Sequence, residues 1–402
     1  MAAERQRECR VTLRQGRERS LKWRHPWVFS GGIERMKPEP DDGDIVAVHA
    51  ADGSFLGRGY YSAGGSIAVK MLSFNDCPID QTFWSDRIAG ARRLRERLGL
   101  VSSTETTGFR LVHAEGDSLP GLIIDLYGRT AVLQCQTTGI QRAREEIVQA
   151  LLEVWGDRLH AIYDKSTSFK NGEDEEVSAA ASYLMGELQE PTFFENGYRF
   201  AANWETGQKT GFFLDQRENR KLVERYAKDR TVLNAFCYTG GFSVYALGGG
   251  AKSVISVDSA QNAIEGLEQN ISLNGMSDRH TAVKADFLRY MQSLTTELDL
   301  IILDPPAFAK QKKALVSGLK GYRSINREAL RAIRPGGILF TFSCSQLVTE
   351  DDFRTVLFEA ALEAKRSVRI LHRLHQAPCH PISLFHPEGN YLKGFVVEVE
   401  DR

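Results

Sequence analysis

Four short apolar runs between residues 231 and 345 constrain the fold of this 402-residue chain more than any other feature. The runs are TVLNAFCYTGG (231–241), SVISVD (253–258), LDLIILDPP (298–306) and ILFTFSCS (338–345). Helix-like sequence separates them, and this alternation is typical of buried parallel strands joined by crossover helices. We therefore expect a doubly wound α/β sheet of about seven strands, the last of them antiparallel. Ligands of such sheets bind beyond the carboxyl ends of the strands, where this chain places glycine, acidic, proline and cysteine residues.

The length of the chain predicts two or three domains rather than one. Residues 1–75 contain short strand-like runs divided by Gly, Asp and Ser turns, and these predict a small β-barrel. Residues 76–185 mix amphipathic helices with strands and predict a small central α+β domain. Residues 186–402 follow as the α/β domain, which begins with a hairpin over residues 186–215.

Composition argues against a membrane protein and against a metal-binding protein. Charged residues make up 26% of the chain, and no apolar run is long enough to cross a bilayer, so no membrane partner is expected. The six cysteines are scattered, without a CxxC pair or zinc-type spacing, so we expect no metal site. Reduced thiols in the cytoplasm are the expected state.

Charge is unevenly distributed, although the net charge is only −1. Residues 1–35 hold nine Lys or Arg against four Glu, and residues 309–327 hold six basic side chains and no acid. Basic patches are the electrostatic footprint of a polyanion such as RNA, although a solvated surface run explains either patch equally well. In the segment RHPWVFSGGI we expect Trp27 and Phe29 to be core residues. The residues expected to face RNA are Arg24, Lys310, Lys312, Lys313, Lys320 and Arg323.

A cofactor site is predicted at the first three strand ends. The turn Tyr238-Thr-Gly-Gly lets the backbone approach a ligand closely, although it lacks the third glycine of a dinucleotide-binding motif. Asp258 ends the next strand, where it could accept both hydroxyls of a ribose, and Asp286 follows beside an aromatic ring. Such a series is how S-adenosylmethionine-dependent methyltransferases hold their cofactor, whereas each acid taken alone could be a helix N-cap. The expected cofactor residues are Gln216, Asn234, Phe236, Tyr238, Thr239, Gly240, Gly241, Asp258, Asp286, Phe287, Asp304 and Pro305.

The last two runs predict catalytic residues. Asp304 is followed by Pro305 and Pro306, which fix its carboxylate to meet the polar edge of a nucleobase. Cys344 leaves the neighbouring strand on the same side of the sheet. A thiolate attacking carbon-6 of cytosine makes carbon-5 nucleophilic, and a protonated Asp304 at N3 would stabilise the charge that develops on the ring. We therefore expect Cys344 and Asp304 to be catalytic.

These strings together resemble those of the bacterial RlmI-type 23S ribosomal RNA 5-methylcytosine methyltransferases. The shared strings are GRERSL, RHPWVFSG, DSLPGL, QKTGFFLDQR, VLNAFCYTGGFSV, VISVD, LDPPAF, GYRSIN, GGILFTFSCS and the closing HP-x-EG-x-Y-x-KGF. The resemblance covers nearly the whole chain. It implies a PUA barrel, a small central domain and a Rossmann-type methyltransferase domain. It further implies S-adenosylmethionine as methyl donor, a cytosine of 23S rRNA as target and Cys344 as nucleophile.

Three other functions compete with this reading. A methyltransferase acting on a base nitrogen would use Asp-Pro-Pro and leave Cys344 idle. A non-catalytic RNA-binding ribosome-assembly factor would retain only the fold. A dinucleotide oxidoreductase is disfavoured by the glycine pattern. The sequence does not identify the cytosine modified, the oligomeric state or the base that removes the carbon-5 proton.

Overall fold

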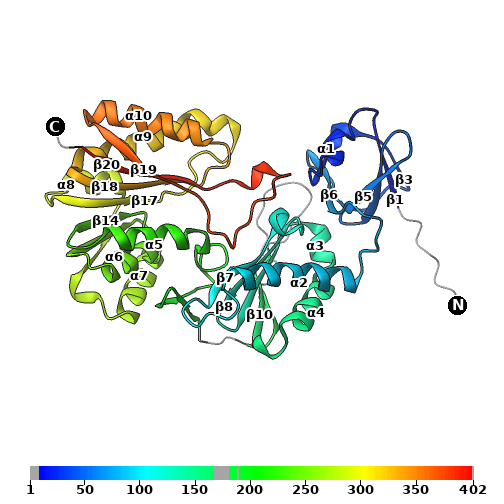
Figure 1. The fold of residues 1–402 in the computed structure, drawn as a ribbon, viewed down its shortest axis with the longest axis horizontal. Helices are drawn as coiled ribbons and strands as arrows, with labels where there is room; N and C mark the ends of the chain where they lie inside the picture. Colours follow the sequence, from blue (N-terminus) through cyan, green and yellow to red (C-terminus); the bar gives the residue numbers. More distant parts are fainter. Residues whose placement is uncertain (1–8, 167–180, 188–189, 401–402) are drawn as a thin grey trace.

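The computed structural model describes residues 9–166, 181–187 and 190–400, which form three bodies of secondary structure (Figure 1). Arg5 and Arg7 of the first basic run therefore lie outside the described residues. The bodies follow one another along the chain, from blue through cyan and green to red in Figure 1. The predicted three-part α/β architecture is confirmed.

The N-terminal body is a six-stranded sheet in the order β2-β6-β5-β4-β1-β3. Its elements are β1 (Cys9–Leu13), α1 (Arg19–Lys22), β2 (Trp27–Phe29), β3 (Ile33–Lys37), β4 (Ile45–His49), β5 (Phe55–Tyr61) and β6 (Ile67–Ser73). Alternate side chains such as Val11, Val46 and Val69 meet in its core. Gly59 is required because a Cβ there would clash with the backbone of Lys70 on β6.

The expectation that Phe29 is a core residue is wrong, since 48% of its surface is exposed. Trp27 is only half-buried. Strand β2 has three residues, and successive side chains of a strand point to opposite faces. Because Val28 takes the inward position and is buried, its two aromatic neighbours face outward. The indole N–H of Trp27 donates instead to Glu115 of the central body at 2.9 Å.

The central body is a five-stranded sheet in the order β11-β10-β9-β8-β7, accompanied by helices. Its elements are α2 (Gln81–Arg97), β7 (Gly108–His113), β8 (Leu122–Tyr127), β9 (Thr130–Cys135), α3 (Thr138–Arg142), α4 (Arg144–Trp155), β10 (Ala161–Asp164) and β11 (Ser182–Met185). The Asp80 carboxylate caps α2 by accepting from the Phe83 N–H. The apolar stripe of α2, which includes Phe83 and Ile88, packs in one core with α4 and the sheet.

The C-terminal body contains the predicted seven-stranded sheet, in the order β16-β15-β14-β17-β18-β20-β19. Its strands are β14 (Thr231–Ala235), β15 (Ser253–Asp258), β16 (His280–Lys284), β17 (Leu298–Leu303), β18 (Ile333–Ser343), β19 (Val368–Leu374) and β20 (Lys393–Val399). The four runs that defined the fold are β14, β15, β17 and β18. They are parallel, and β20 is antiparallel to both β18 and β19.

Helices cover both faces of this sheet, and a hairpin precedes it (Figure 1). These elements are β12 (Thr192–Glu195), β13 (Tyr198–Ala201), α5 (Arg217–Tyr226), α6 (Gly241–Gly248), α7 (Gln261–Leu273), α8 (Phe287–Ser293), α9 (Leu315–Ala332) and α10 (Glu350–Ala364). Helix α9 lies in the basic segment, where no helix or strand was predicted. Its buried face includes Tyr322, Ile325 and Ala329, which follow helical spacing.

A long connection between β19 and β20, residues 375–392, reaches out of the C-terminal body toward the other two (Figure 1). We refer to it as the strap. The guanidinium of Arg95 on α2 is fully buried, pairs with Asp117, and donates to the strap carbonyl of Cys379 at 2.7 Å. The ring of His386 lies 4.5 Å from that of Trp27. The strap therefore packs against both the central and the N-terminal bodies.

Candidate active site

The first strand end is a strained turn. After β14 the chain reverses through Phe236 and Tyr238, both with positive φ (57° and 47°), before Gly240 (φ 78°) opens α6. Non-glycine residues adopt this conformation only when the surrounding structure holds them there, and such strain is concentrated at functional sites. At Gly240 a Cβ would clash with Leu267 of α7. A glycine is therefore required at this position, both by its positive φ and by its close packing against α7.

The two acids expected at this edge are both engaged by backbone N–H groups. Asp258 accepts from Tyr238 at 2.9 Å and from Ala260 at 3.0 Å, so it ties the first turn to the second strand end. Asp286 caps α8 by accepting from Arg289 at 3.1 Å. Asp286 is therefore a helix N-cap, as the alternative interpretation predicted. Capping leaves lone pairs of the carboxylate free, because a carboxylate has about four acceptor positions.

Aromatic and polar groups complete the turn. The rings of Phe236 and Phe287 lie 5.4 Å apart between the first and third strand ends. Asn234 is fully buried beneath α6. Its side-chain amide donates to the Ser243 hydroxyl at 2.8 Å and does not lie on the surface of the turn. Its Oδ1 and the Thr239 hydroxyl have no hydrogen-bond partner although both are buried. Unsatisfied buried polar atoms of this kind call for a partner.

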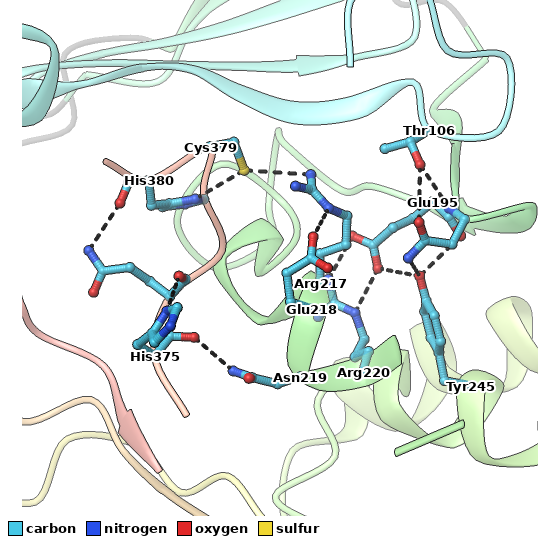
Figure 2. A network of polar contacts seen from close by, with 12 residues as sticks. Thr106, Glu195, Arg217, Glu218, Asn219, Arg220, Tyr245, His375, Cys379 and His380 are labelled. Carbon is cyan, nitrogen blue, oxygen red and sulfur yellow. Dashed lines mark hydrogen bonds and ion pairs between the residues drawn. The ribbon is translucent and has the colours of Figure 1, made fainter. Parts of the chain in front are cut away.

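Below the turn, helix α5 supplies two buried arginines that connect the hairpin and the strap (Figure 2). Arg220 makes a bidentate pair with Glu195, with both N–O distances 2.7 Å, and donates to the Phe213 carbonyl at 2.9 Å. Arg217 reaches the thiol of Cys379 at 3.5 Å. The Tyr245 hydroxyl of α6 also donates to Glu195 at 3.0 Å. The network fixes the position of α5, and the N-terminal end of this helix lies beside the end of β17.

Asp304 and Cys344 are brought together as expected, because they follow the neighbouring parallel strands β17 and β18. The Cys344 thiol lies 3.8 Å from the carbonyl oxygen of Pro305. The Ser345 hydroxyl accepts from Ala309 N at 3.2 Å and pairs with the Tyr322 hydroxyl at 2.8 Å. These bonds join the two loops that carry the acid and the thiol.

Burial and the neighbouring carboxylate of Asp215 raise the pKa of Asp304 to about 7. Burial, reinforced by the Asp304 carboxylate and opposed by Lys209, raises the pKa of Cys344 to about 11. The thiol is therefore protonated at neutral pH in this state. It gains thiolate character when Asp304 is protonated or when a cation approaches.

Two lysines that the sequence analysis did not single out supply positive charge here. Lys393, the first residue of β20, is 4% exposed and donates to the Ser345 carbonyl at 2.7 Å. Burial lowers its pKa to about 8, against the opposing effect of the Cys344 thiolate. Lys209 is exposed and lies 5.1 Å from the ring centre of Phe213. Both belong to strings that were already noted, QKTGFFLDQR and Y-x-KGF, although nothing in those strings marks a lysine as buried.

The residues expected to bind RNA divide into two groups. Arg24, Lys310, Lys312, Lys313 and Lys320 are exposed. Arg323 instead pairs with Glu359 at 3.1 Å and Glu363 at 3.4 Å of α10. These ion pairs hold α9 to α10 and leave 34% of the Arg323 side chain exposed, so its contact with RNA stays a prediction.

Comparison with known proteins agrees with this geometry. Residues 172–387 match the S-adenosylmethionine-dependent methyltransferase family, and residues 11–74 match the PUA-like domain. The chain is 42% identical to ribosomal RNA large subunit methyltransferase I of Shewanella frigidimarina, over 97% of this chain and 99% of that protein. It is 41% identical to the protein of the same name from Aeromonas hydrophila, over 96% and 98%. The chain belongs to the ribosomal RNA large subunit methyltransferase I family. The resemblance stated from the sequence is thus confirmed.

Solved structures agree with the fold. A protein of Streptococcus mutans assigned as a SAM-dependent methyltransferase superposes with a TM-score of 0.83 at 24% identity, over 97% of this chain and all of that one. A methyltransferase crystallised with S-adenosylhomocysteine (SAH) gives 0.84 at 25% identity, with the same coverage. S-adenosylmethionine is accordingly the cofactor of the family.

The residues at the first two strand ends suit that cofactor. The glycine turn at Gly240, the remaining lone pairs of Asp258 and the unpartnered Thr239 hydroxyl can bind a polar ligand containing a ribose. Within the described ranges no group of three or more His, Cys, Asp or Glu could hold a metal ion. Nor is any helix there long and apolar enough to cross a membrane.

Proposed function

We propose that this protein methylates carbon-5 of a cytosine in 23S ribosomal RNA through a covalent bond between Cys344 and carbon-6 of the base. The proposal rests on the pairing of Cys344 with Asp304 at neighbouring strand ends, beside the donor turn. The relatives named for methylation of large-subunit ribosomal RNA support the substrate. A cytoplasmic location follows from such a substrate.

The chain's own residues can carry each proton and bond change that precedes transfer. The Cys344 thiol, whose pKa is raised, first loses its proton to solvent, and the resulting thiolate attacks carbon-6. The electrons of the carbon-5 to carbon-6 double bond then move through carbon-4 to N3. Asp304, with its raised pKa, donates a proton to N3 and so neutralises the ring. Carbon-5 is then an enamine carbon able to attack an electrophile. S-adenosylmethionine, when bound, supplies the methyl group as that electrophile.

We assign the donor site to Gln216, Phe236, Tyr238, Thr239, Gly240, Gly241, Asp258, Asp286, Phe287 and Pro305, with Asn234 supporting the turn from below. Lys310, Lys312 and Lys313 follow the Asp-Pro-Pro loop and are exposed, and their positive charge suits an RNA backbone. Arg24 is an exposed positive charge on the N-terminal body. We retain residues 1–75, 76–185 and 186–402 as the division into RNA-binding, central and methyltransferase domains.

Methyl transfer from labelled S-adenosylmethionine to 23S rRNA, followed by nucleoside analysis, tests the proposal. We expect labelled 5-methylcytidine with the wild type and none with Cys344→Ala. Cys77→Ala is the matched control, because Cys77 is also only partly buried but belongs to the central body's core. Full activity of Cys344→Ala, or label on a base nitrogen, would select the alternative that leaves the cysteine idle. No transfer to any RNA by the wild type would favour a non-catalytic assembly factor.

A further inference from the structure

One buried carboxylate in this site has a free oxygen. Asp215 lies in the short turn Leu214–Gln216 that leads into α5, and only 7% of its surface is exposed. Its Oδ2 accepts from the hydroxyl of Tyr391 in the strap at 2.6 Å, and its backbone carbonyl accepts from Ala377 N at 2.8 Å. Its Oδ1 is buried without a hydrogen-bond partner. The side chain is therefore fixed by one oxygen while the other is uncommitted.

Asp215 shares its turn with Gln216, whose side chain hydrogen-bonds Asp304, so the turn borders the catalytic acid. After burial, its charge is the largest influence raising the pKa of Asp304, and it also contributes to the raised pKa of Cys344. The two guanidinium groups in the neighbourhood are engaged elsewhere. Arg110 pairs with Asp125 through two 2.7 Å bonds, and Arg220 pairs with Glu195 in the same bidentate manner. Neither guanidinium forms a direct pair with the Asp215 carboxylate.

An anion with one free oxygen needs a reason to be buried here. Burying a carboxylate oxygen costs free energy unless it has a partner. In a site that transfers protons, the proton that the oxygen accepts is such a partner. Two neighbouring carboxylates also divide their roles. Asp304, whose pKa is raised, holds a proton and donates it, and the free oxygen of Asp215 can accept one.

We propose that Asp215 is the base that removes the proton from carbon-5 after methylation and so releases the product. This inference rests on the proposed function. At that stage carbon-5 carries both a methyl group and a hydrogen, and the Cys344 sulfur is bonded to carbon-6. Asp215 Oδ1 takes the hydrogen as a proton. The electron pair of that C–H bond forms the carbon-5 to carbon-6 double bond, and the C–S bond breaks with its pair leaving on sulfur as thiolate. The N3 proton returns to the Asp304 carboxylate.

Tyr391 is then a positioning residue, because its hydroxyl holds the other oxygen of the base. It belongs to the strap, which packs against the central and N-terminal bodies. The two residues come from segments 176 positions apart, so only the folded strap brings the tyrosine to the base.

Asp215→Asn tests this role, since asparagine keeps the shape and can still accept the Tyr391 bond. With labelled S-adenosylmethionine and 23S rRNA, we expect steady turnover to fall by about 100-fold or more. A first methyl group should still be transferred, so labelled RNA should accumulate covalently attached to the protein on denaturing gels. The wild type should show little of this species. Glu218→Gln is the matched control. It also replaces a carboxylate by an amide, three residues from Asp215, but the Glu218 side chain is 52% exposed.

Three results would overturn the role of Asp215. One is turnover of Asp215→Asn within threefold of the wild type. Another is loss of the first methyl transfer without accumulation of the adduct. The third is a tenfold or larger loss of SAH affinity by calorimetry, which would make Asp215 a cofactor ligand. Trapping of wild-type protein on RNA containing 5-fluorocytidine separates these results from failure of the proposed function. If that adduct forms and Asp215→Asn behaves as in any of the three cases, only the role of Asp215 is wrong.

Discussion

The thiol of Cys344 lies 3.8 Å from the carbonyl oxygen of Pro305, the residue that follows Asp304. This contact joins the end of β18 to the end of β17 and places a nucleophile beside an acid. The distance results from the parallel register of the two strands, in which Leu303 lies opposite Thr341. The chemistry proposed for this site depends on that relationship.

The thiol should respond to the buried lysine behind it. Lys393→Met removes a cation near Cys344, and a thiolate loses stability when a neighbouring cation is lost. We expect alkylation of Cys344 by iodoacetamide at pH 8 to slow several-fold, as measured by peptide mass spectrometry, while Cys77 serves as an internal reference. Lys228→Met, at an exposed lysine, is the control. An unchanged alkylation rate would show that Lys393 has only a structural role.

The pH dependence of single-turnover methylation should report Asp304. Below its pKa of about 7 the acid is protonated, and the rate should rise with pH as the fraction of Cys344 thiolate rises. Above pH 7 the gain in thiolate is offset by loss of the Asp304 proton, so the rate should level off. Lys209, Asp215 and Arg220 are the charged groups facing the acid. In Asp304→Asn the amide keeps a donor, and the remaining, slower rate should continue to rise past pH 7. A profile that levels off at the same pH in both would exclude Asp304 as the titrating group.

The free energy of unfolding should also depend on Asp304, but the contribution of Asp304 should fall as the pH rises. Because the folded pKa of Asp304 lies above its unfolded value near 3.8, the folded state binds more protons between these values. The contribution of Asp304 to stability is thus present at low pH and lost as pH rises toward 7. Asp304→Asn should gain stability relative to the wild type at pH 8, by up to about 4 kcal/mol, and much less at pH 4. Urea unfolding at both pH values measures this difference, and equal effects at both would contradict it.

RNA binding should depend on the lysines that follow the Asp-Pro-Pro loop. Replacing Lys312 and Lys313 with Glu should weaken binding to 23S rRNA fragments and reduce the slope of log K against log salt by about 1.4–1.8, as expected for two lost phosphate contacts. SAH affinity should remain unchanged. The control is Lys228→Glu, at an exposed lysine in the turn after α5. A fall in SAH affinity instead would place this segment in the donor pocket.

The buried pair below the donor turn should be sensitive to loss of one partner. Glu195 and Arg220 are 0% and 3% exposed, and Glu195→Gln leaves the guanidinium buried without a counter-charge. We expect a loss of about 3–5 kcal/mol in the free energy of unfolding. Glu224→Gln, in the more exposed pair with Lys221, should cost no more than about 1 kcal/mol. Similar losses in both variants would mean that burial of the first pair adds nothing.

The parallel sheet and the pairing of Asp304 with Cys344 could be predicted because both depend on local patterns. Apolar runs define strands, and the carboxyl ends of parallel strands meet at one edge. The exposure of Phe29 and the ion pairs of Arg323 could not be predicted in this way. Each depends on which element packs on the residue. Strand β2 is an edge strand paired with β6, and α10 brings two glutamates to Arg323 of α9.

The roles of Asp215, Tyr391 and Lys393 escaped the sequence analysis for a related reason. Their motifs were visible, but their proximity depends on the strap returning to the site after β19. Burial of a lysine beside a cysteine, and of an aspartate with one free oxygen, exists only in the folded chain. Sequence spacing contains no signal for either.

The covalent role of Cys344 can be measured by mass spectrometry of the protein trapped on 23S rRNA containing 5-fluorocytidine in the presence of S-adenosylmethionine. Fluorine at carbon-5 cannot leave as a proton does, so the covalent intermediate should persist. We predict that the nucleotide is attached to the peptide containing Cys344, through its sulfur, and that Cys344→Ala forms no adduct. An active enzyme that forms no adduct, or an attachment at another residue, would contradict the account.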